Sequence, residues 1–122
     1  MSQKTDTDSL DQLSHRLANF ARARDWEPFH SPKNLSMALI AEAAELVEHF
    51  QWLTQAESAA LPGDRHEAVR MELADILIYL VRLGERLDID LIRAAHDKMD
   101  RNETRFPVDK VRGQARRASE YD

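Results

Sequence analysis

Two pairs of acidic residues have the spacing that a metal site built on helices requires. Glu42 and Glu45 are three positions apart, as are Glu72 and Asp75. At about 100° per residue, positions three apart in an α-helix lie on one face, so each pair presents two carboxylates together. If the pairs face one another, each contact at about 4 Å costs roughly 4 kcal/mol of repulsion at an effective dielectric near 20. Mg²⁺, or Mn²⁺ as its substitute, would neutralise such an all-oxygen cluster.

The surroundings of both pairs are apolar. Leu39 and Leu46 share the helix face of Glu42, and Ile76 shares that of Glu72. A single Glu-x-x-Glu in a helix is usually an ordinary surface ion pair, whereas two pairs inside apolar stripes favour a metal site. The segments EAAELVEHF and ELADILIYL also align with each other, which suggests a duplicated helical hairpin.

A row of phosphate-compatible side chains follows in the last predicted helix. Lys98, Asn102 and Arg105 recur at i, i+4 and i+7, so they share one face. All three donate hydrogen bonds that phosphate oxygens accept, although a solvated helix edge has the same pattern. The row therefore predicts phosphate contacts only in combination with the acidic pairs.

Residues at both ends of the second predicted helix suit a nucleobase. They can stack on a ring and hydrogen-bond its edge, and they are Trp26, His30, Asn34 and Trp52. A local core or an oligomer contact would use the same residue types. His30 and His49 receive no catalytic role here, and Tyr79, one turn beyond Asp75, either packs in the core or orients a ligand.

The elements that carry these residues are predicted to be helices. Only 3 glycines and 4 prolines occur in 122 residues, which favours an all-α fold. Three- and four-residue spacing and helix-breaking residues predict helices at about 10–24, 32–53 and 65–87, and a fourth that is capped by Asp88 or Asp90 and stops before Pro107. Their expected starts are Asp8 or Ser9, Ser31-Pro32, the region after Pro62-Gly63, and Asp88 or Asp90.

Length and composition bound the remaining possibilities. The chain suits one domain, residues 1–122, with a core at about 8–106, a polar tail at 107–122 and a partner chain to complete the burial. A net charge of −5 without a dense basic block argues against nucleic-acid binding. The absence of cysteine excludes disulfides and thiolate sites, and no apolar run suits a signal peptide or membrane span. We therefore expect a soluble, cytoplasmic protein.

Four segments, in this order, resemble the MazG-like all-α nucleoside triphosphate pyrophosphohydrolases, and especially their dCTP pyrophosphatase branch. The segments are DWEPFHSPKNL at 25–35, EAAELVEHFQW at 42–52, ELADILIYL at 72–80, and KMDRN with RFP at 98–107. The resemblance spans about residues 10–107, which is most of the chain.

The resemblance implies hydrolysis of a nucleoside triphosphate, dCTP or a related pyrimidine nucleotide, to the monophosphate and pyrophosphate. It implies Mg²⁺ ligands at Glu42, Glu45, Glu72 and Asp75, a base and sugar pocket of Trp26, His30, Asn34, Trp52 and Tyr79, and phosphate contacts at Lys98 and Asn102. Glu45 or its neighbour Glu48 is the candidate general base. The implied assembly is a homotetramer, and at least a dimer, of four-helix bundles whose sites are completed between subunits. Leu17 departs from the polar pocket residue of similar dCTP enzymes, which leaves the exact base preference open.

Two alternatives compete with this interpretation. A non-enzymatic helical interaction module would use the acids as a charged groove, and its stability would not depend on divalent ions. A ferritin-like di-iron bundle would need Glu-x-x-His pairs on helices, but the one instance here, Glu27 to His30, contains Pro28 and lies in a predicted loop.

Overall fold

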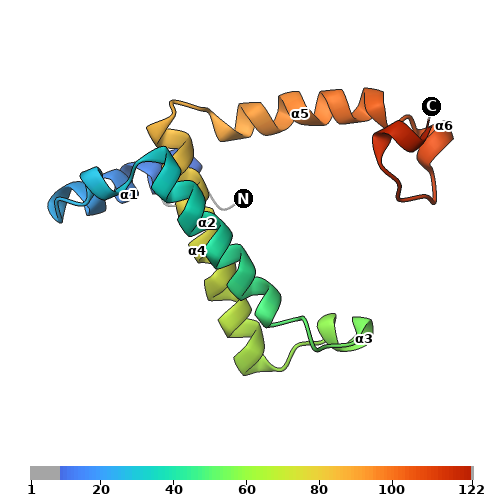
Figure 1. Cartoon of the computed structure of the whole chain (residues 1–122), viewed down its shortest axis with the longest axis horizontal. Helices are drawn as coiled ribbons and strands as arrows, with labels where there is room; N and C mark the ends of the chain where they lie inside the picture. Colours follow the sequence, from blue (N-terminus) through green and yellow to red (C-terminus); the bar gives the residue numbers. More distant parts are fainter. Residues whose placement is uncertain (1–8, 122) are drawn as a thin grey trace, which may run out of the picture. The chain divides into compact units, whose positions relative to one another are not determined.

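Every regular element in the described part of the chain is helical, which confirms the all-α prediction (Figure 1). The computed structural model describes residues 9–121. The helices are α1 (Leu10–Ala23), α2 (Pro32–Glu48), α3 (Gln55–Ser58), α4 (Gly63–Arg86), α5 (Leu91–Arg105) and α6 (Val108–Val111), with 3-10 turns η2 (Glu27–Phe29) and η3 (Ala118–Tyr121). Within that range no helix is both long enough and apolar enough to cross a bilayer.

Local caps set three of the predicted helix starts. Ser9, Ser31 and Asp90 each accept a hydrogen bond from the backbone N–H three residues later, at 3.1 Å. Such bonds satisfy amide groups that have no partner within the helix. Pro32 follows Ser31 at the first position of α2, where an N–H is not needed. Asp8, the alternative cap of α1, lies outside the described residues.

The predicted end of the second helix, at about residue 53, is wrong, because α2 ends at Glu48. The N–H groups of Phe50 and Gln51 both bond to the carbonyl of Val47, and the chain turns away. The guanidinium of Arg65, on α4, donates a hydrogen bond to the backbone carbonyl of His49 at 2.9 Å. This bond satisfies one of the carbonyl groups that have no partner within the helix at its C-terminal end.

A short helix that the sequence analysis did not predict follows this turn. Thr54 and Glu57 form a reciprocal capping box, with bonds of 3.1 and 2.9 Å, and so begin α3. The Thr-x-x-Glu spacing was visible in the sequence and is a known signature of a helix start.

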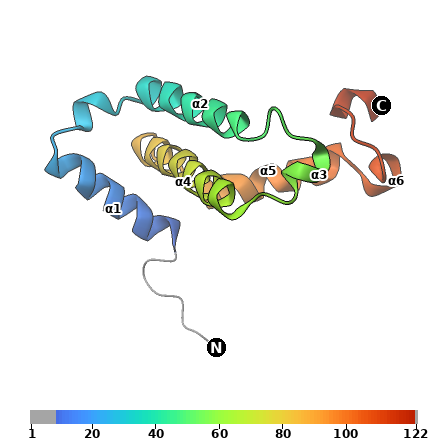
Figure 2. The same cartoon turned by 90° about the horizontal axis from the view of Figure 1, so that it is seen from below.

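The described residues form two units, which divide between Asp88 and Ile89. In the first, α2 lies along α4, and α1 also packs on α4 (Figures 1 and 2). Its buried apolar side chains come from all three helices and are Ala21, Leu35, Val69 and Val81. The second unit contains α5 and then α6 and η3, which lie in the predicted polar tail.

Helices α2 and α4 each expose a second set of apolar side chains. On α2 these residues recur every three or seven positions, at Met37, Ile40 and Val47, with 58, 67 and 58% of each residue exposed. On α4 they are Met71, Leu73, Leu77 and Leu80. Because an amphipathic helix needs only one apolar stripe to face its own core, these additional stripes leave a large apolar surface uncovered.

Candidate active site

Helices α2 and α4 bring three of the four predicted metal ligands together. Oxygen atoms of Glu42, Glu45 and Glu72 all lie within 4.8 Å of one another. They meet because α2 packs along α4 and each helix turns an acidic position toward the other. Asp75, one helical turn after Glu72, is exposed and lies outside this group of three, although its charge still acts on Glu42. We call these three residues the acidic cluster.

Two oxygen atoms of the acidic cluster are buried without a protein donor. Among the described residues, Glu42 Oε2 and Glu72 Oε1 have no hydrogen-bond partner, whereas Glu45 is exposed. A buried carboxylate without a donor or a cation is energetically costly. Half-buried oxygen donors on one side and an exposed carboxylate on the other suit a hard divalent cation that keeps some of its water. The donor set therefore fits a metal site.

Crowding raises the pKa of two acids in the cluster. A hydrogen bond with Glu72, followed by burial and the charges of Glu72 and Asp75, raises the pKa of Glu42. A hydrogen bond with Glu42 and its charge, then burial and the charge of Glu48, raise the pKa of Glu45. A carboxyl–carboxyl hydrogen bond needs a proton, and a cation can replace that proton as the neutralising charge.

The loop before α2 brings together three of the residues predicted to contact the base. Trp26 contacts His30 edge-on, with 6.4 Å between ring centroids, and contacts Phe20 in the same way at 5.6 Å. The Asn34 side chain donates to the carbonyl of Phe29 at 3.1 Å, which ties the loop to the first turn of α2. Trp26 remains 44% exposed, so its ring retains a free surface.

A buried arginine that the sequence analysis missed contacts this loop. The Nε–H of Arg82, on α4, donates to Nδ1 of His30 at 3.2 Å. Burial, and then the charges of Arg82 and Arg86, lower the pKa of His30. The available sequence clue was an arginine inside the apolar run LIYLVRLG, because a cation in such a run is expected to be paired.

Trp52 lies at the other end of α2 from this loop. It is 87% exposed, whereas His30 precedes the helix and is half-buried. A helix of 17 residues is about 26 Å long, since each residue adds roughly 1.5 Å. One chain therefore does not bring His30 and Trp52 to a single base. Tyr79 is half-buried on α4, one turn beyond Asp75.

The predicted phosphate row lies on α5, in the second unit. Lys98 and Arg105 are exposed and Asn102 is half-buried. The guanidinium of Arg105 is 5.8 Å from the centroid of the Phe106 ring. The acidic cluster belongs to the first unit, so the joint action of the row and the cluster stays a prediction.

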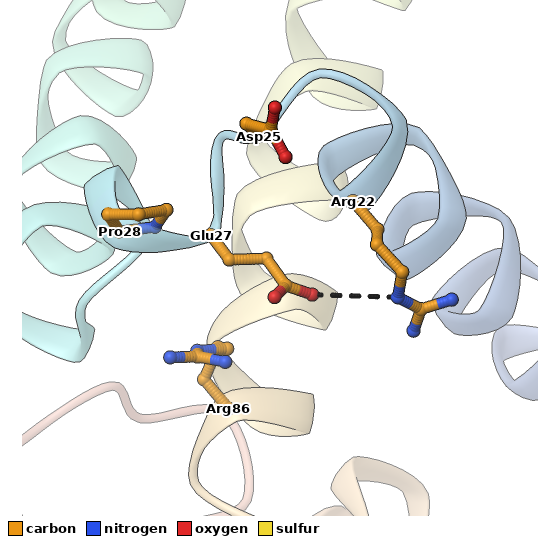
Figure 3. A pocket seen from close by; sticks show the side chains of 5 residues that line it. All are labelled: Arg22, Asp25, Glu27, Pro28 and Arg86. Carbon is orange, nitrogen blue, oxygen red and sulfur yellow. Dashed lines mark ion pairs between the residues drawn. The ribbon is translucent and has the colours of Figure 1, made fainter.

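A separate pocket of about 390 Å³ contains none of the predicted site residues (Figure 3). Its lining comes from α1, the loop before α2, and α4, and consists of Arg22, Asp25, Glu27, Pro28 and Arg86. The Glu27 side chain extends into it, and one of its oxygens lies 3.8 Å from Nε of Arg22 (Figure 3). This exposed ion pair ties the loop to α1 only weakly.

Comparison with known proteins identifies similar sequences and a similar fold. The model of the MazG-like family matches residues 38–120. dCTP pyrophosphatase 1 of Rattus norvegicus is 47% identical over 110 residues, 88% of this chain and 64% of that protein. dCTP pyrophosphatase 1 of Homo sapiens is 42% identical over 114 residues, 92% of this chain and 67% of the human protein. The chain therefore spans just under two thirds of the length of the rat relative.

A solved structure gives an independent match. A pyrophosphatase from Archaeoglobus fulgidus superposes with a TM-score of 0.77 at 34% sequence identity. The superposition covers 88% of this chain and 97% of the archaeal chain. The likeness therefore extends over both the sequence and the arrangement of the helices.

Proposed function

The chain belongs to the MazG-like family, and from that premise we propose that it hydrolyses a nucleoside triphosphate to the monophosphate and pyrophosphate in a metal-dependent reaction. The proposed substrate is dCTP or a related pyrimidine deoxynucleotide, because the relatives are dCTP pyrophosphatases. The single observation that carries the proposal is the acidic cluster with its two unpartnered buried oxygens. An interaction module gains nothing from such costly atoms.

The acidic residues would hold the metal ion. Glu42, Glu45 and Glu72 supply the clustered oxygens, and Asp75 is the predicted fourth ligand. Bound Mg²⁺, or Mn²⁺ in its place, would connect this acidic site to the triphosphate and offset charge that develops on the phosphate oxygens. Such a link is needed because the protein has a net charge of −5 and its substrate is also an anion.

The remaining polar residues would act on water and phosphate. Glu45 is exposed and close enough to Glu48 for their charges to interact, so one of the two would accept the proton of the attacking water. Lys98, Asn102 and Arg105 would hold the outgoing β- and γ-phosphates, with attack at the α-phosphorus.

The base pocket would be shared between chains. Trp26, His30 and Asn34 would come from one chain and Trp52 from another, because the length of α2 separates them within one chain. The exposed apolar stripes of α2 and α4 support the association that this requires. The proposed assembly is a homotetramer of helical bundles, and at least a dimer. Leu17, half-buried on α1, leaves the exact base preference open.

A nucleotide panel with Mg²⁺, read by pyrophosphate release, tests the proposal. We expect dCTP or a 5-modified relative to be the best substrate and expect no release when the metal is chelated. A purine triphosphate preferred tenfold would refute the pocket assignment alone. Inactivity on every nucleotide, together with a thermal melt that Mg²⁺ does not change, would support the interaction module instead.

Isotope labelling tests which phosphorus is attacked. In ¹⁸O-labelled water the label should enter the nucleoside monophosphate, because the water oxygen stays on the phosphorus that it attacks. Label in pyrophosphate would indicate attack at the β-phosphorus. Release of orthophosphate with a diphosphate would indicate attack at the γ-phosphorus, and either result would overturn the proposed mechanism.

A further inference from the structure

Arg82 is the one charged residue that is buried in the described part of the chain, with 3% of its surface exposed. Its Nη1 donates to Glu85 at 2.8 Å, and its Nε donates to His30 at 3.2 Å. Its Nη2 is buried and has no protein acceptor among the described residues. The neighbouring Glu85 is a sufficient counter-charge, so the contact with His30 is not needed to neutralise Arg82.

The contact fixes the protonation pattern of His30. A guanidinium only donates hydrogen bonds, so the imidazole nitrogen that faces it, Nδ1, must be bare. A neutral imidazole then carries its single proton on Nε2. Burial and the positive charges of Arg82 and Arg86 oppose a second proton, because they lower the pKa of this histidine.

We propose that Arg82 is a positioning residue that holds His30 as the neutral Nε2–H tautomer, so that His30 offers a hydrogen-bond donor to an acceptor atom of the bound base. This inference rests on the proposed function, in which His30 contacts the nucleotide. A cytosine ring suits such a donor, because its carbonyl oxygen and its unprotonated ring nitrogen are adjacent acceptors. Without Arg82 the proton would be free to move to Nδ1, and Nε2 would then present an acceptor to the same atoms.

Arg86 provides a matched control. It lies one turn after Arg82 on α4, and its charge also lowers the pKa of His30. The structure shows no hydrogen bond from Arg86 to His30, and Arg86 instead lines the pocket of Figure 3. Arg86→Gln therefore removes a nearby cation and leaves the Arg82–His30 bond in place.

The tautomer can be measured without any catalytic assay. In ¹⁵N NMR of histidine-labelled wild-type protein at pH 7, with the signal assigned by loss in His30→Gln, we expect His30 to have a protonated Nε2 and a bare Nδ1. The pattern should persist in Arg86→Gln and give way to a mixture in Arg82→Met. A wild-type His30 that is protonated on Nδ1, or on both nitrogens, would overturn the inference even if Arg82→Met does not fold.

Kinetics separate positioning from a purely structural role. Arg82→Met should raise KM for dCTP about tenfold with a smaller effect on kcat, since a charge-assisted bond that orders the ring is lost. In the His30→Ala background the same substitution should add no further change, because Arg82 acts through His30. Losses that add in the double variant would show that Arg82 only supports the fold. If the wild-type protein hydrolyses no nucleotide, the proposed function is refuted. The NMR experiment would still test whether Arg82 sets the tautomer of His30.

Discussion

The buried oxygens of Glu42 and Glu72 make the acidic cluster unfavourable in the metal-free protein. Neither atom has a donor among the described residues, and the carboxylates repel one another. A protein tolerates such groups where binding a ligand repays their cost. Removing one of these charges should therefore raise the stability of the metal-free protein and lower its activity at the same time. Ordinary core or surface positions do not show this combination.

Glu42→Gln tests this combination. We expect kcat to fall by more than about 100-fold, because even groups that merely support metal ligands change activity by roughly 10–100-fold. We also expect the metal-free variant to melt at a higher temperature than wild type, since one clustered charge is gone. Activity with Mg²⁺ and melts with and without Mg²⁺ measure both effects.

Glu67→Gln is the control for that experiment. Glu67 lies on the same helix as Glu72 but is exposed and pairs with Arg70 at 2.9 Å. Its loss should leave activity and the effect of Mg²⁺ on the melt unchanged, since exposed pairs contribute about 0–1 kcal/mol. Unchanged activity in Glu42→Gln would remove the basis for the metal assignment.

Trp52→Ala should raise KM for the nucleotide about tenfold and lower kcat much less. Stacking of a base on an aromatic ring contributes roughly 1–3 kcal/mol, and it stabilises the ground state and the transition state alike. Since Trp52 is 87% exposed and is not part of the buried core of the chain, the variant should keep the stability of wild type. A fall in kcat at unchanged KM would exclude simple stacking.

The lowered pKa of His30 predicts a pH dependence of stability. The unfolded chain, whose histidine has the ordinary pKa of about 6.5, binds this proton more readily than the folded chain. The free energy of unfolding should therefore be unaffected by this group above that pH and should decline as the pH falls below it. Urea midpoints between pH 7.5 and 5 should therefore fall less steeply in His30→Gln than in wild type.

Sequence spacing reveals residues that act within one helix, and it misses residues that act between helices. Glu42 and Glu45 could be paired because positions three apart share a face whatever the tertiary structure. Arg82 reaches His30 across 52 positions of sequence, and no periodicity encodes that contact. The position of Arg82 inside an apolar run indicated that it would be paired. Its partner, His30, could be identified only from the way α4 packs beside the loop that precedes α2.

At the scale of the elements, the starts of helices were predictable and the end of α2 was not. Ser9, Ser31 and Asp90 act on the backbone three residues away, so their effect is local and visible in sequence. Apolar spacing continues past Glu48 to Leu53, yet the helix stops where Arg65, sixteen positions away, satisfies the carbonyl of His49. The position at which α2 ends therefore depends on a tertiary contact, which helix periodicity does not reveal.

Ser31→Ala should destabilise the protein by about 1 kcal/mol, the usual effect of losing an N-cap hydroxyl. The first turn of α2 would lose the hydrogen bond that the backbone N–H of Asn34 donates to the Ser31 hydroxyl oxygen. Ser36→Ala is the matched control, because that hydroxyl bonds back to a carbonyl within the helix and alanine favours helix there. Equal urea midpoints for the two variants would contradict the capping role.

At the scale of the whole molecule, the separation of His30 from Trp52 predicts that chains share their pockets. His30→Ala and Trp52→Ala should each be weak enzymes alone, because every pocket in either assembly lacks one contact. Mixing the two variants, unfolding them together and refolding them should regenerate pockets that take His30 from one chain and Trp52 from the other. Recovered activity at low dCTP measures this exchange, and a mixture no better than its components would place the whole pocket within one chain.

The length of α2 also has a consequence for inheritance. A cell that carries two different defective copies of this gene, one altered near residue 30 and the other near residue 52, would assemble some intact pockets from two faulty chains. The two alleles would then complement each other, whereas two alleles altered at the same end of the helix would not. Two alleles that both damage the acidic cluster should not complement each other, because Glu42, Glu45 and Glu72 all come from a single chain.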